Sequence, residues 1–385
     1  MSKIIIVTTS LSCGGITSFL IPLVNFLSNE GHNVTLAYTK DEGGFLCRFN
    51  SNINFLQYQP LSKKQSIRIW CKHFAFYDMA RVRFRKNTQK PHYPSLQRLG
   101  YITAKYVNVT DDFFDVAISS AEGFCNALVA NNINANKKIG WVHPDMGSIG
   151  LDVKSGKNVV DKLDYVVAVS ETGCNSLKRF FPHAQSKILY IENMLDIDDI
   201  IKRSLEKIDD MPLLDGYTNI VTVCRITNDS KRLDRIIKIA SILKENNYKF
   251  RWSIIGNGPD FLLIKELVNN YNLANNVILL GSRTNPLPYI KRADCFVLTS
   301  QFEGKPVVIE EAKILHTPVI VTEYSSAKIQ VTPNIGVVVP NVDGVLENDI
   351  AKLLMDNSLL NSIKKACLSY QYDINRSVNI IKSIM

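Results

Sequence analysis

The residues best suited to chemistry lie in one short stretch, FEGKPVVIEEA, which spans Phe302 to Ala312 and holds three glutamates. Gly304 and Pro306 let the chain turn sharply into a helix, because proline is tolerated in a first helical turn. The N–H groups at the start of that helix would attract an anion, since they lie at the positive end of the helix dipole. The stretch therefore predicts an anion-binding helix start beside Glu303.

The three glutamates differ in where their side chains should point. Within the predicted helix Val307, Glu311 and Ile314 share one face, whereas Glu310 is rotated from Glu311 by about 100°. A carboxylate in line with apolar neighbours is the one expected to be partly buried and to grip a group such as a ribose diol. We predict that Glu310 faces solvent. Spacing alone leaves open that all three are ordinary surface glutamates.

Two cations are predicted to lie near this stretch. Arg225 closes the β-rich run TNIVTVCRI, and Lys231 follows six residues later at the start of the next helix. Both would stand at the carboxyl end of the sheet, the side from which Glu303 also emerges. Two fixed cations there would neutralise a leaving diphosphate as charge builds in the transition state. An isolated Arg and Lys at a strand–helix junction are otherwise common on protein surfaces.

The first half of the chain offers weaker candidates. Gly14 and Gly15 follow the first predicted strand and precede a helix, so their N–H groups could face a diphosphate. They do not form the dinucleotide fingerprint G-x-G-x-x-G, because they are adjacent and no third glycine follows. The turn GNGP at Gly256 is likewise incomplete. His143 ends a buried strand in GWVHPDMG, although a lone histidine is commonly just a packed side chain.

No metal site and no membrane span are predicted. The eight cysteines are scattered without a C-x-x-C pair, which indicates reduced thiols in a cytosolic protein and argues against zinc. The acidic runs 111–115 and 196–198 are interpreted as helix caps and loop charges. The N-terminal run KIIIVTTS is interpreted as a buried strand and not as a signal peptide. No run approaches the roughly 18 to 20 apolar residues of a membrane helix.

The wider pattern predicts two α/β domains. Apolar strands alternate with helices from KIIIVTTS to LDYVVAVS, and the alternation restarts at TNIVTVCRI. Strands that are apolar throughout indicate a parallel sheet covered on both faces, and such sheets bind ligands at the carboxyl ends of their strands. We predict Rossmann-like domains at 1–205 and 206–374, with the site in the cleft between them. Residues 375–385 are predicted to form a helix that packs back on the first domain.

The net charge of +9 is unevenly placed, because one segment, residues 61–105, is strongly basic. It holds eleven Lys or Arg against a single acid, Asp78, with aromatic residues interleaved. Such a segment suits an anionic membrane surface or a phosphate-rich ligand, and it also resembles a single-stranded nucleic-acid platform. A solvated helical hairpin is the plain alternative. The cations are Lys63, Lys64, Arg68, Lys72, Arg81, Arg83, Arg85, Lys86, Lys90, Arg98 and Lys105.

Together these residues resemble the retaining GT-B glycosyltransferases of group 1, also called family 4. The similarity is clearest between residues 220 and 322. There VTVCRITNDSKRLDRII resembles the family's strand–Arg…Lys–helix, WSIIGNGPD resembles its glycine turn, and FEGKPVVIEEA contains its E-x7-E pair, Glu303 and Glu311. The Asn285-Pro286 pair is common among bacterial members that build capsule or lipopolysaccharide. The first domain matches only in outline, through GGI, WVH and VSE.

The resemblance implies an α/β GT-B fold, in which two Rossmann-like domains face each other across a deep cleft. It implies that Arg225 and Lys231 bind the diphosphate of a nucleotide sugar and that Glu311 binds its ribose. Glu303 would contact the transferred sugar, and His143 would lie near the anomeric carbon or its leaving group. The family retains anomeric configuration and needs no bound metal. Further donor contacts are expected at Gly14, Gly15, Gly256, Gly304, Lys305, Pro306 and Val307.

Two departures from the family pattern lie near the predicted site. Lys305 stands where many members have an aromatic or small residue, and it could alter which sugar or phosphate is preferred. Cys224 replaces the usual glycine before the arginine. Neither change removes a charged group that the mechanism needs.

We therefore expect a glycosyltransferase that moves a hexose or N-acetylhexosamine, with UDP as the expected nucleotide. The expected acceptor is a glycan, a lipid-linked intermediate or a polymer in surface-polysaccharide synthesis. No cofactor, metal or nucleic acid is expected. We expect a cytoplasmic location, peripheral on the inner face of the cell membrane, and contact with partner glycosyltransferases. The alternatives are a GT-B sugar-nucleotide epimerase, a non-catalytic accessory subunit and, more distantly, a nucleic-acid binder.

Overall fold

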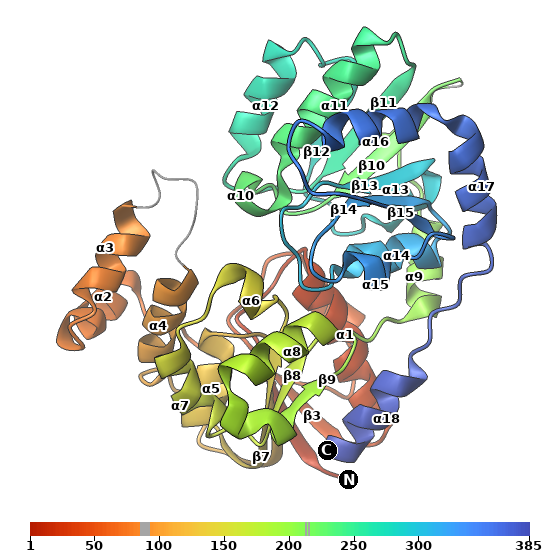
Figure 1. Cartoon of the computed structure of the whole chain (residues 1–385). Coiled ribbons are helices and arrows are strands. Elements are labelled where there is room, and N and C mark those ends of the chain that lie inside the picture. Colours follow the sequence, from red (N-terminus) through yellow and green to blue (C-terminus); the bar gives the residue numbers. More distant parts are fainter. Residues whose placement is uncertain (85–92, 212–213, 215) are drawn as a thin grey trace. The chain divides into compact units, whose positions relative to one another are not determined.

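The chain forms two compact units, which the computed structural model describes at residues 1–84, 93–211, 214 and 216–385 (Figure 1). The first unit comprises Met1–Met194 and Ile374–Met385, and the second comprises Leu195–Asp373. The second unit thus begins earlier than residue 206, where the sequence pattern placed the boundary.

The difference in boundary has a physical cause in helix α9 (Ile197–Ser204), which packs against helices of the second unit. The side chain of Asn285 donates a hydrogen bond of 2.9 Å to the carbonyl oxygen of Arg203 in this helix. Arg203 in turn donates to the carbonyl oxygen of Thr284 at 3.2 Å. The Asn285-Pro286 turn therefore fixes α9 to the second unit.

The first unit is built on a seven-stranded sheet in the order β5-β3-β1-β6-β7-β8-β9, in which every neighbouring pair is parallel. Ile5 and Val7 belong to the apolar cluster on one side of the sheet, and Ile4 and Ile6 belong to the cluster on the other. Both faces are covered, which explains the continuous apolar run in this strand. The strands are β1 (Lys3–Val7), β3 (Asn33–Tyr38), β5 (Asn54–Gln57), β6 (Phe113–Ser119), β7 (Asn134–Val142), β8 (Tyr165–Ala168) and β9 (Ile188–Tyr190), with the separate pair β2 (Ser10–Leu11) and β4 (Lys40–Asp41).

The second unit is built on a six-stranded parallel sheet in the order β12-β11-β10-β13-β14-β15. Its strands are also buried on both faces, with Ile220 and the adjacent Val221 in opposite clusters. The prediction of two parallel α/β units is thus confirmed. The strands are β10 (Thr218–Val223), β11 (Phe250–Ile255), β12 (Val277–Gly281), β13 (Cys295–Leu298), β14 (Val319–Thr322) and β15 (Gly336–Val339).

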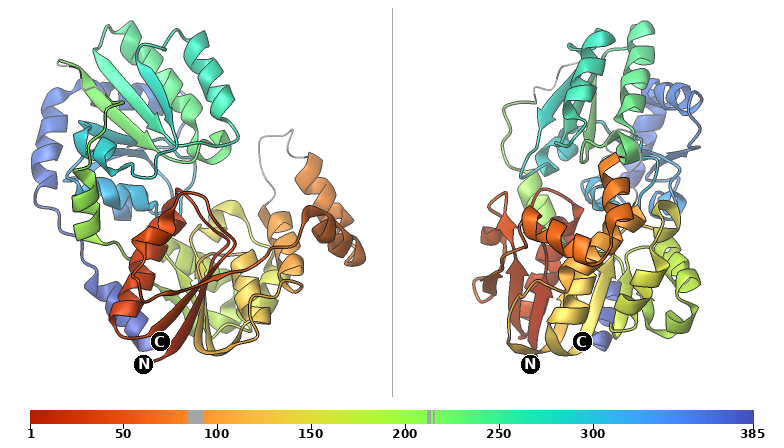
Figure 2. Two further views of the ribbon diagram at one scale, coloured as in Figure 1. Left: turned by 180° about the vertical axis from the view of Figure 1, so that it is seen from behind. Right: turned by 90° about the vertical axis from the view of Figure 1, so that its left-hand side faces the viewer.

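Helices cover the faces of both sheets (Figure 2). Those of the first unit are α1 (Gly15–Asn29), η1 (Phe45–Arg48), α2 (Lys63–Lys72), α3 (Phe76–Phe84), α4 (Tyr93–Ala104), α5 (Phe124–Asn132), α6 (Met146–Ile149), α7 (Val153–Val160), α8 (Glu171–Phe180), η3 (Pro182–Lys187) and α18 (Asn375–Ile384). Besides α9, those of the second unit are α10 (Asn228–Lys231), α11 (Leu233–Glu245), α12 (Phe261–Asn270), α13 (Leu287–Arg292), α14 (Val307–Ile314), α15 (Ala327–Gln330), α16 (Leu346–Met355) and α17 (Asn357–Cys367).

The last helix, α18, belongs to the first unit although it follows the second in sequence. Ile381 and Ile384 lie in an apolar cluster with residues of α1 and β1. Lys382 forms an ion pair of 2.7 Å with Glu30, and Lys137 donates to the carbonyl oxygen of Met385 at 3.1 Å. The chain thus returns to its first unit and is held there by apolar and polar contacts.

The basic segment 61–105 forms α2, α3 and α4. Trp70 of α2 donates from Nε1 to the hydroxyl of Thr103 in α4 at 2.8 Å. Arg85, Lys86 and Lys90 of the predicted basic set lie outside the described residues. Among the residues that the structure describes, no helix combines the length and apolar character needed to cross a membrane.

Candidate functional site

The carboxyl edge of the second sheet brings Lys231 and Glu303 into direct contact. Lys231 lies at the end of α10, after β10, and Glu303 lies in the loop between β13 and α14. The Lys231 ammonium is ion-paired with Oε1 of Glu303, and the hydroxyl of Ser300 donates to the same oxygen at 2.6 Å. Their side chains are 20% and 12% exposed, so water screens the pair only partly. The two residues predicted at this edge are therefore brought together.

The loops that carry this pair are tied to each other by the backbone. Thr299 donates from its hydroxyl to the carbonyl oxygens of Lys231 at 3.2 Å and Arg232 at 3.0 Å. The amide of Gln301 donates to the carbonyl oxygen of Ser230 at 2.7 Å. Since each contact joins the β10–α11 loop to the β13–α14 loop, neither residue of the pair can move far without the other.

A buried arginine in α11, Arg235, stabilises the β13–α14 loop through hydrogen bonds. The Arg235 side chain is 1% exposed and donates to the carbonyl oxygen of Thr299 at 2.9 Å and to Oε1 of Gln301 at 2.8 Å. Its Nε donates to Asp343 at 2.8 Å. Burial lowers the pKa of Arg235, and the Asp343 carboxylate opposes that effect. Arg235 and Asp343 thus stabilise the loops that carry Lys231 and Glu303. Sequence spacing did not indicate this role for either residue.

Helix α14 buries two glutamates, and they differ from the expectation in one respect. Glu311 is 8% exposed, as predicted for a carboxylate in line with Val307. Glu310 was predicted to face solvent, and this prediction is wrong, because it is 6% exposed. It accepts from the Tyr370 hydroxyl at 2.7 Å and forms an ion pair of 2.8 Å with Lys313. Glu310 is therefore a packing residue with partners of its own.

The chain between Glu303 and α14 is held through its carbonyl oxygens. Ser325 donates to the carbonyl of Glu303 at 3.1 Å, Ser326 donates to that of Gly304, and Gln330 donates to that of Pro306 at 3.0 Å. Pro306 is the N-cap of α14, one residue before the helical turn where we expected it, and no side chain caps this helix. The N–H groups that begin α14 thus have no side-chain acceptor at the N-cap. Lys305 and Val307 flank this point.

Gly256 is required by the close approach of two loops. Its φ is 143°, and a Cβ added there would lie 1.8 Å from the carbonyl oxygen of Cys224. The amide of Ile226 donates to the carbonyl oxygen of Asn257 at 3.0 Å, so the GNGP turn rests directly on the loop that carries Arg225. Arg225 itself is exposed at this edge. The observed role of Gly256 is to let these backbones touch.

At the carboxyl edge of the first sheet, His143 follows β7 and is held by backbone contacts. Its Nε2 lies 2.8 Å from the carbonyl oxygen of Ser120, and its amide donates to Glu122 at 3.1 Å. The ring packs edge-on against Phe19 with centroids 5.3 Å apart. Burial lowers the pKa of His143, while the Glu122 charge and the Ser120 carbonyl act to raise it. Because only the Nε2–H can donate to Ser120, the neutral ring keeps Nδ1 as its acceptor.

Gly14 and Gly15 lie at the same edge, because β1, β6 and β7 are parallel neighbours. Gly14 is the N-cap of α1, which begins at Gly15 and carries Phe19 one turn later. A Cβ added at Gly14 would meet nothing within 4 Å, so packing does not require a glycine there. The sequence analysis did not single out Glu122, although a carboxylate three residues after a buried strand was the signal that could have found it.

The acidic runs behave as caps and surface charges. Asp196 caps α9 by accepting from the amide of Asp199 at 2.9 Å, and Asp112 pairs with Lys3 at 3.2 Å. In the described ranges, no group of three His, Cys, Asp or Glu side chains is arranged to hold a metal ion.

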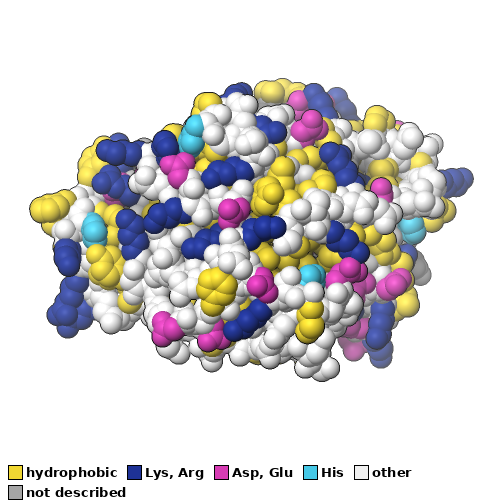
Figure 3. Space-filling model, turned by 90° about the horizontal axis from the view of Figure 1, so that it is seen from below, with side chains coloured by type: hydrophobic (Ala, Val, Ile, Leu, Met, Phe, Trp, Pro, Cys, Tyr) yellow, Lys and Arg dark blue, Asp and Glu magenta, His cyan; other side chains and the backbone are white. Residues whose placement is uncertain are grey.

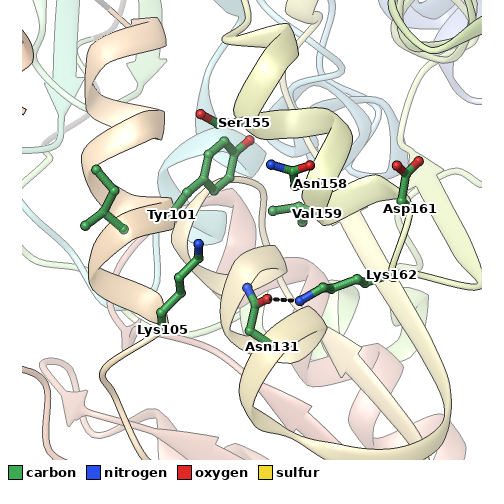
Figure 4. A pocket seen from close by; sticks show the side chains of 9 residues that line it. Tyr101, Lys105, Asn131, Ser155, Asn158, Val159, Asp161 and Lys162 are labelled. Atoms are coloured by element: carbon green, nitrogen blue, oxygen red, sulfur yellow. Dashed lines mark hydrogen bonds between the residues drawn. The ribbon is translucent and has the colours of Figure 1, made fainter. Parts of the chain in front are cut away.

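A cavity of about 340 Å³ lies elsewhere in the first unit, among α4, α5 and α7 (Figure 4). Asn131 and Lys162 line it, and the Lys162 ammonium donates to Oδ1 of Asn131 at 2.6 Å. Asn131 lies in the last turn of α5, shortly before β7 begins, which places the cavity at the amino edge of the sheet. It is therefore separate from the edge that carries His143.

Comparison with solved structures defines the class of fold. A crystal structure of a variant of Staphylococcus aureus TarM, in complex with fondaparinux, alpha-GlcNAc-glycerol and UDP, aligns with a TM-score of 0.69. It is 13% identical in sequence, and the alignment covers 100% of this chain and 99% of that one. With two parallel α/β units and this likeness, the chain has the GT-B fold.

Sequence comparison then identifies the second unit. Residues 206–368 match the family described as glycosyl transferases group 1. An uncharacterized glycosyltransferase of Methanocaldococcus jannaschii is 29% identical over 167 residues, which is 42% of this chain and 40% of that protein. The Campylobacter jejuni N-acetylgalactosamine-N,N'-diacetylbacillosaminyl-diphospho-undecaprenol 4-alpha-N-acetylgalactosaminyltransferase is 28% identical over 43% of each chain. The matched region thus spans about two fifths of these relatives. The second unit is thus similar in sequence to group 1 glycosyltransferases.

Proposed function

We propose that this protein is a retaining glycosyltransferase of family 4. It moves a hexose or N-acetylhexosamine from a nucleoside-diphosphate sugar, with UDP as the nucleotide, to a surface glycan or its lipid-linked precursor. The observation that carries the proposal is the shielded Lys231–Glu303 pair at the carboxyl edge of a sheet whose sequence matches group 1. Ligands bind at this edge in doubly wound folds.

The second unit supplies the groups that a nucleotide sugar needs. Arg225 and Lys231 would bind the diphosphate and neutralise the charge that builds on it as the glycosidic bond breaks. The N–H groups around Gly304 to Val307 would face the same phosphates, since α14 lacks a side-chain cap. Glu311 would accept hydrogen bonds from the ribose hydroxyls.

Glu303 would accept from hydroxyls of the transferred sugar. Ser300 already holds its carboxylate in one orientation, so little freedom is lost when a sugar binds. Diphosphate binding would draw Lys231 toward the donor and release the carboxylate for the sugar. Gly256 would act mainly by holding the Arg225 loop, and Lys305 would bias the choice of sugar or phosphate.

The first unit would complete the site through Gly14, Gly15 and His143. The two glycines would bring unobstructed N–H groups to the diphosphate, and Nδ1 of His143 would accept from a hydroxyl near the anomeric carbon. Since fixed cations and helix N–H groups can neutralise the leaving diphosphate, we propose that no metal or other cofactor is needed. Activity that survives chelation by EDTA is the expected result.

The acceptor class is supported by the relatives. The Campylobacter jejuni enzyme is named for transfer to a diphospho-undecaprenol-linked sugar, and the TarM structure contains UDP and alpha-GlcNAc-glycerol. We therefore propose a polyprenyl-linked glycan or glycan polymer as acceptor. Work on such an acceptor would place the protein in the cytoplasm, peripheral on the inner face of the membrane, beside partner glycosyltransferases.

Donor binding gives the first test. Melting temperature would be measured with UDP-, GDP- and ADP-sugars, because a bound ligand stabilises the folded state. We expect UDP-sugars to raise it most, and Glu311→Ala to abolish the rise. NMR of the reaction with a polyprenyl-linked acceptor should then show a product with the donor's anomeric configuration. An inverted product, or donor consumed without acceptor as an epimerase would do, contradicts the proposal.

A further inference from the structure

Helix α2 presents its cations on one face and packs with the other. Lys63, Lys64, Arg68 and Lys72 are exposed, and helical geometry places them within a half-circle that also holds Ile67. The other half of the helix holds the buried Ser66 and also Trp70, which donates to Thr103 of α4. The helix is therefore oriented by its packing, and its cationic face points to solvent.

Asp78, the only Asp or Glu in residues 61–105, is buried and does not contribute to the exposed surface of this segment. Asp78 in α3 is 6% exposed, accepts from the hydroxyl of Ser95 at 2.8 Å and pairs with Arg98 at 3.3 Å. Among the described residues of 61–105 it is the sole Asp or Glu. The exposed surface of this segment therefore carries cations and no carboxylate.

The turn between α2 and α3 is aromatic and projects into solvent. Phe74 is 83% exposed, and its φ of 53° is uncommon for a bulky residue. Phe76 and Tyr77 are 55% and 63% exposed, and the Phe74 and Phe76 rings lie 6.5 Å apart. The Arg81 guanidinium lies over the Tyr77 ring at 4.1 Å. Three large apolar side chains thus cluster at one tip, next to the cationic face.

We propose that the α2–α3 hairpin docks on an anionic lipid bilayer, with Phe74, Phe76 and Tyr77 inserted at the interface. The cations of α2 would lie among the anionic headgroups. This inference rests on the proposed function insofar as a polyprenyl-linked acceptor would be met at that surface. Lys and Arg side chains gather beside hydrophobic ones at the end of the molecule where α2 and α3 lie, at the left of Figure 3.

The distribution of these side chains favours a bilayer over a nucleic acid. A single-stranded platform alternates aromatic side chains and cations along one groove. Here the exposed aromatic side chains of the α2–α3 hairpin gather at its turn, and the cations follow along one face of α2. This distribution matches a lipid interface with apolar groups deeper than charges. Anionic lipids attract each Lys or Arg near the surface, and aromatic insertion adds apolar burial.

Vesicle flotation of the full chain, without donor or acceptor, tests the docking independently of transferase activity. We expect binding to phosphatidylcholine vesicles that contain phosphatidylglycerol and little binding to phosphatidylcholine alone. Replacing the tip by Phe74→Ser, Phe76→Ser and Tyr77→Ser should weaken partitioning by about tenfold or more, because burying one such side chain is worth about that factor. The matched control, Leu262→Ser with Leu263→Ser, changes two exposed apolar residues of α12 and should bind like the parent.

Charge is tested with a second matched pair. Lys63→Glu, Lys64→Glu and Arg68→Glu together should abolish binding to the anionic vesicles. Lys249→Glu, Lys265→Glu and Lys352→Glu change the net charge equally on exposed residues of the second unit and should not abolish it. A separate Phe74→Trp variant should show a blue shift in tryptophan emission on adding anionic vesicles.

Three outcomes would overturn the proposal. The first is equal vesicle binding by the parent and the tip variant, with both folded by circular dichroism. The second is equal loss of binding in the two charge variants, which would indicate a nonspecific charge effect. The third is tighter binding to single-stranded oligonucleotide than to anionic vesicles in the same buffer.

Discussion

The backbone amide of His143 donates a hydrogen bond of 3.1 Å to the carboxylate of Glu122. This contact places a negative charge close to the partly buried imidazole ring of His143. Burial lowers the pKa of His143, and the Glu122 charge opposes that effect. Glu122→Gln should therefore lower the pKa of His143 further. An NMR titration of the imidazole signals, with His143→Gln to assign the peak, would measure the change.

The same pair predicts how stability varies with pH. A histidine whose folded pKa is depressed favours the unfolded state once the pH falls below its unfolded value of about 6.5. Glu122→Gln should therefore increase the stability that the protein loses as the pH falls below about 6.5. Glu122→Asp keeps the charge and should lose about as much stability as the parent. Identical melting temperatures for the Gln variant and the parent from neutral pH to pH 5 would contradict this account.

Lys231→Ala and Glu303→Ala should each reduce turnover by about 100-fold to 1000-fold, as expected for removing a preorganised charge from a transition state. The protein offers a matched control at the same edge, because Lys328 and Glu323 form an exposed ion pair after β14. Lys328→Ala and Glu323→Ala should leave turnover near the parent value. Steady-state rates with saturating donor, checked against melting temperature, make the comparison. Equal loss in both pairs would mean that general surface charge matters and the site does not.

The two adjacent glutamates of α14 should separate stability from binding. Glu310→Ala leaves Lys313 buried without its ion-pair partner, so the free energy of unfolding should fall by about 3–5 kcal/mol. Glu311→Gln keeps the side-chain shape and should mainly weaken donor affinity. Chemical denaturation and UDP-sugar titration measure the two effects. Similar denaturation midpoints for Glu310→Ala and the parent would show that the buried contacts contribute little.

Much of the fold and part of the site could be predicted from sequence, because strand burial and strand–helix junctions leave local signals. The continuous apolar runs predicted two parallel sheets, and the junctions placed Arg225, Lys231 and Glu303 at one edge. Helical spacing was correct for Glu311, which is 8% exposed, as expected for a carboxylate in line with Val307. It failed for Glu310, because one of its acceptor contacts comes from Tyr370, sixty positions away.

The contacts that support the site could not be predicted from local sequence pattern for the same reason. In the sequence, Arg235 looks like any other cation in a helix. Its hydrogen bonds to Thr299 and Asp343 form only because the fold brings these distant residues together. Aromatic residues of the basic segment were also indistinguishable in sequence. The structure sorts them, with Trp70 fixing α2 to α4 and Phe74 projecting into solvent. The roles of Arg235 and Trp70 thus depend on contacts with residues that are distant in the sequence.

Two glycines should respond differently to the same substitution. Gly256→Ala puts a Cβ 1.8 Å from the carbonyl oxygen of Cys224 at a φ of 143°, so the GNGP turn must leave the Arg225 loop. We expect a loss of about 3 kcal/mol in the free energy of unfolding, the upper end of the cost of a strained backbone position. Gly14→Ala meets nothing within 4 Å and should change stability little while weakening donor binding, if its N–H faces the diphosphate. Denaturation curves and UDP-sugar titrations on both variants decide the matter. A Gly14 variant as unstable as the Gly256 variant, or with parental donor affinity, would remove Gly14 from the donor site.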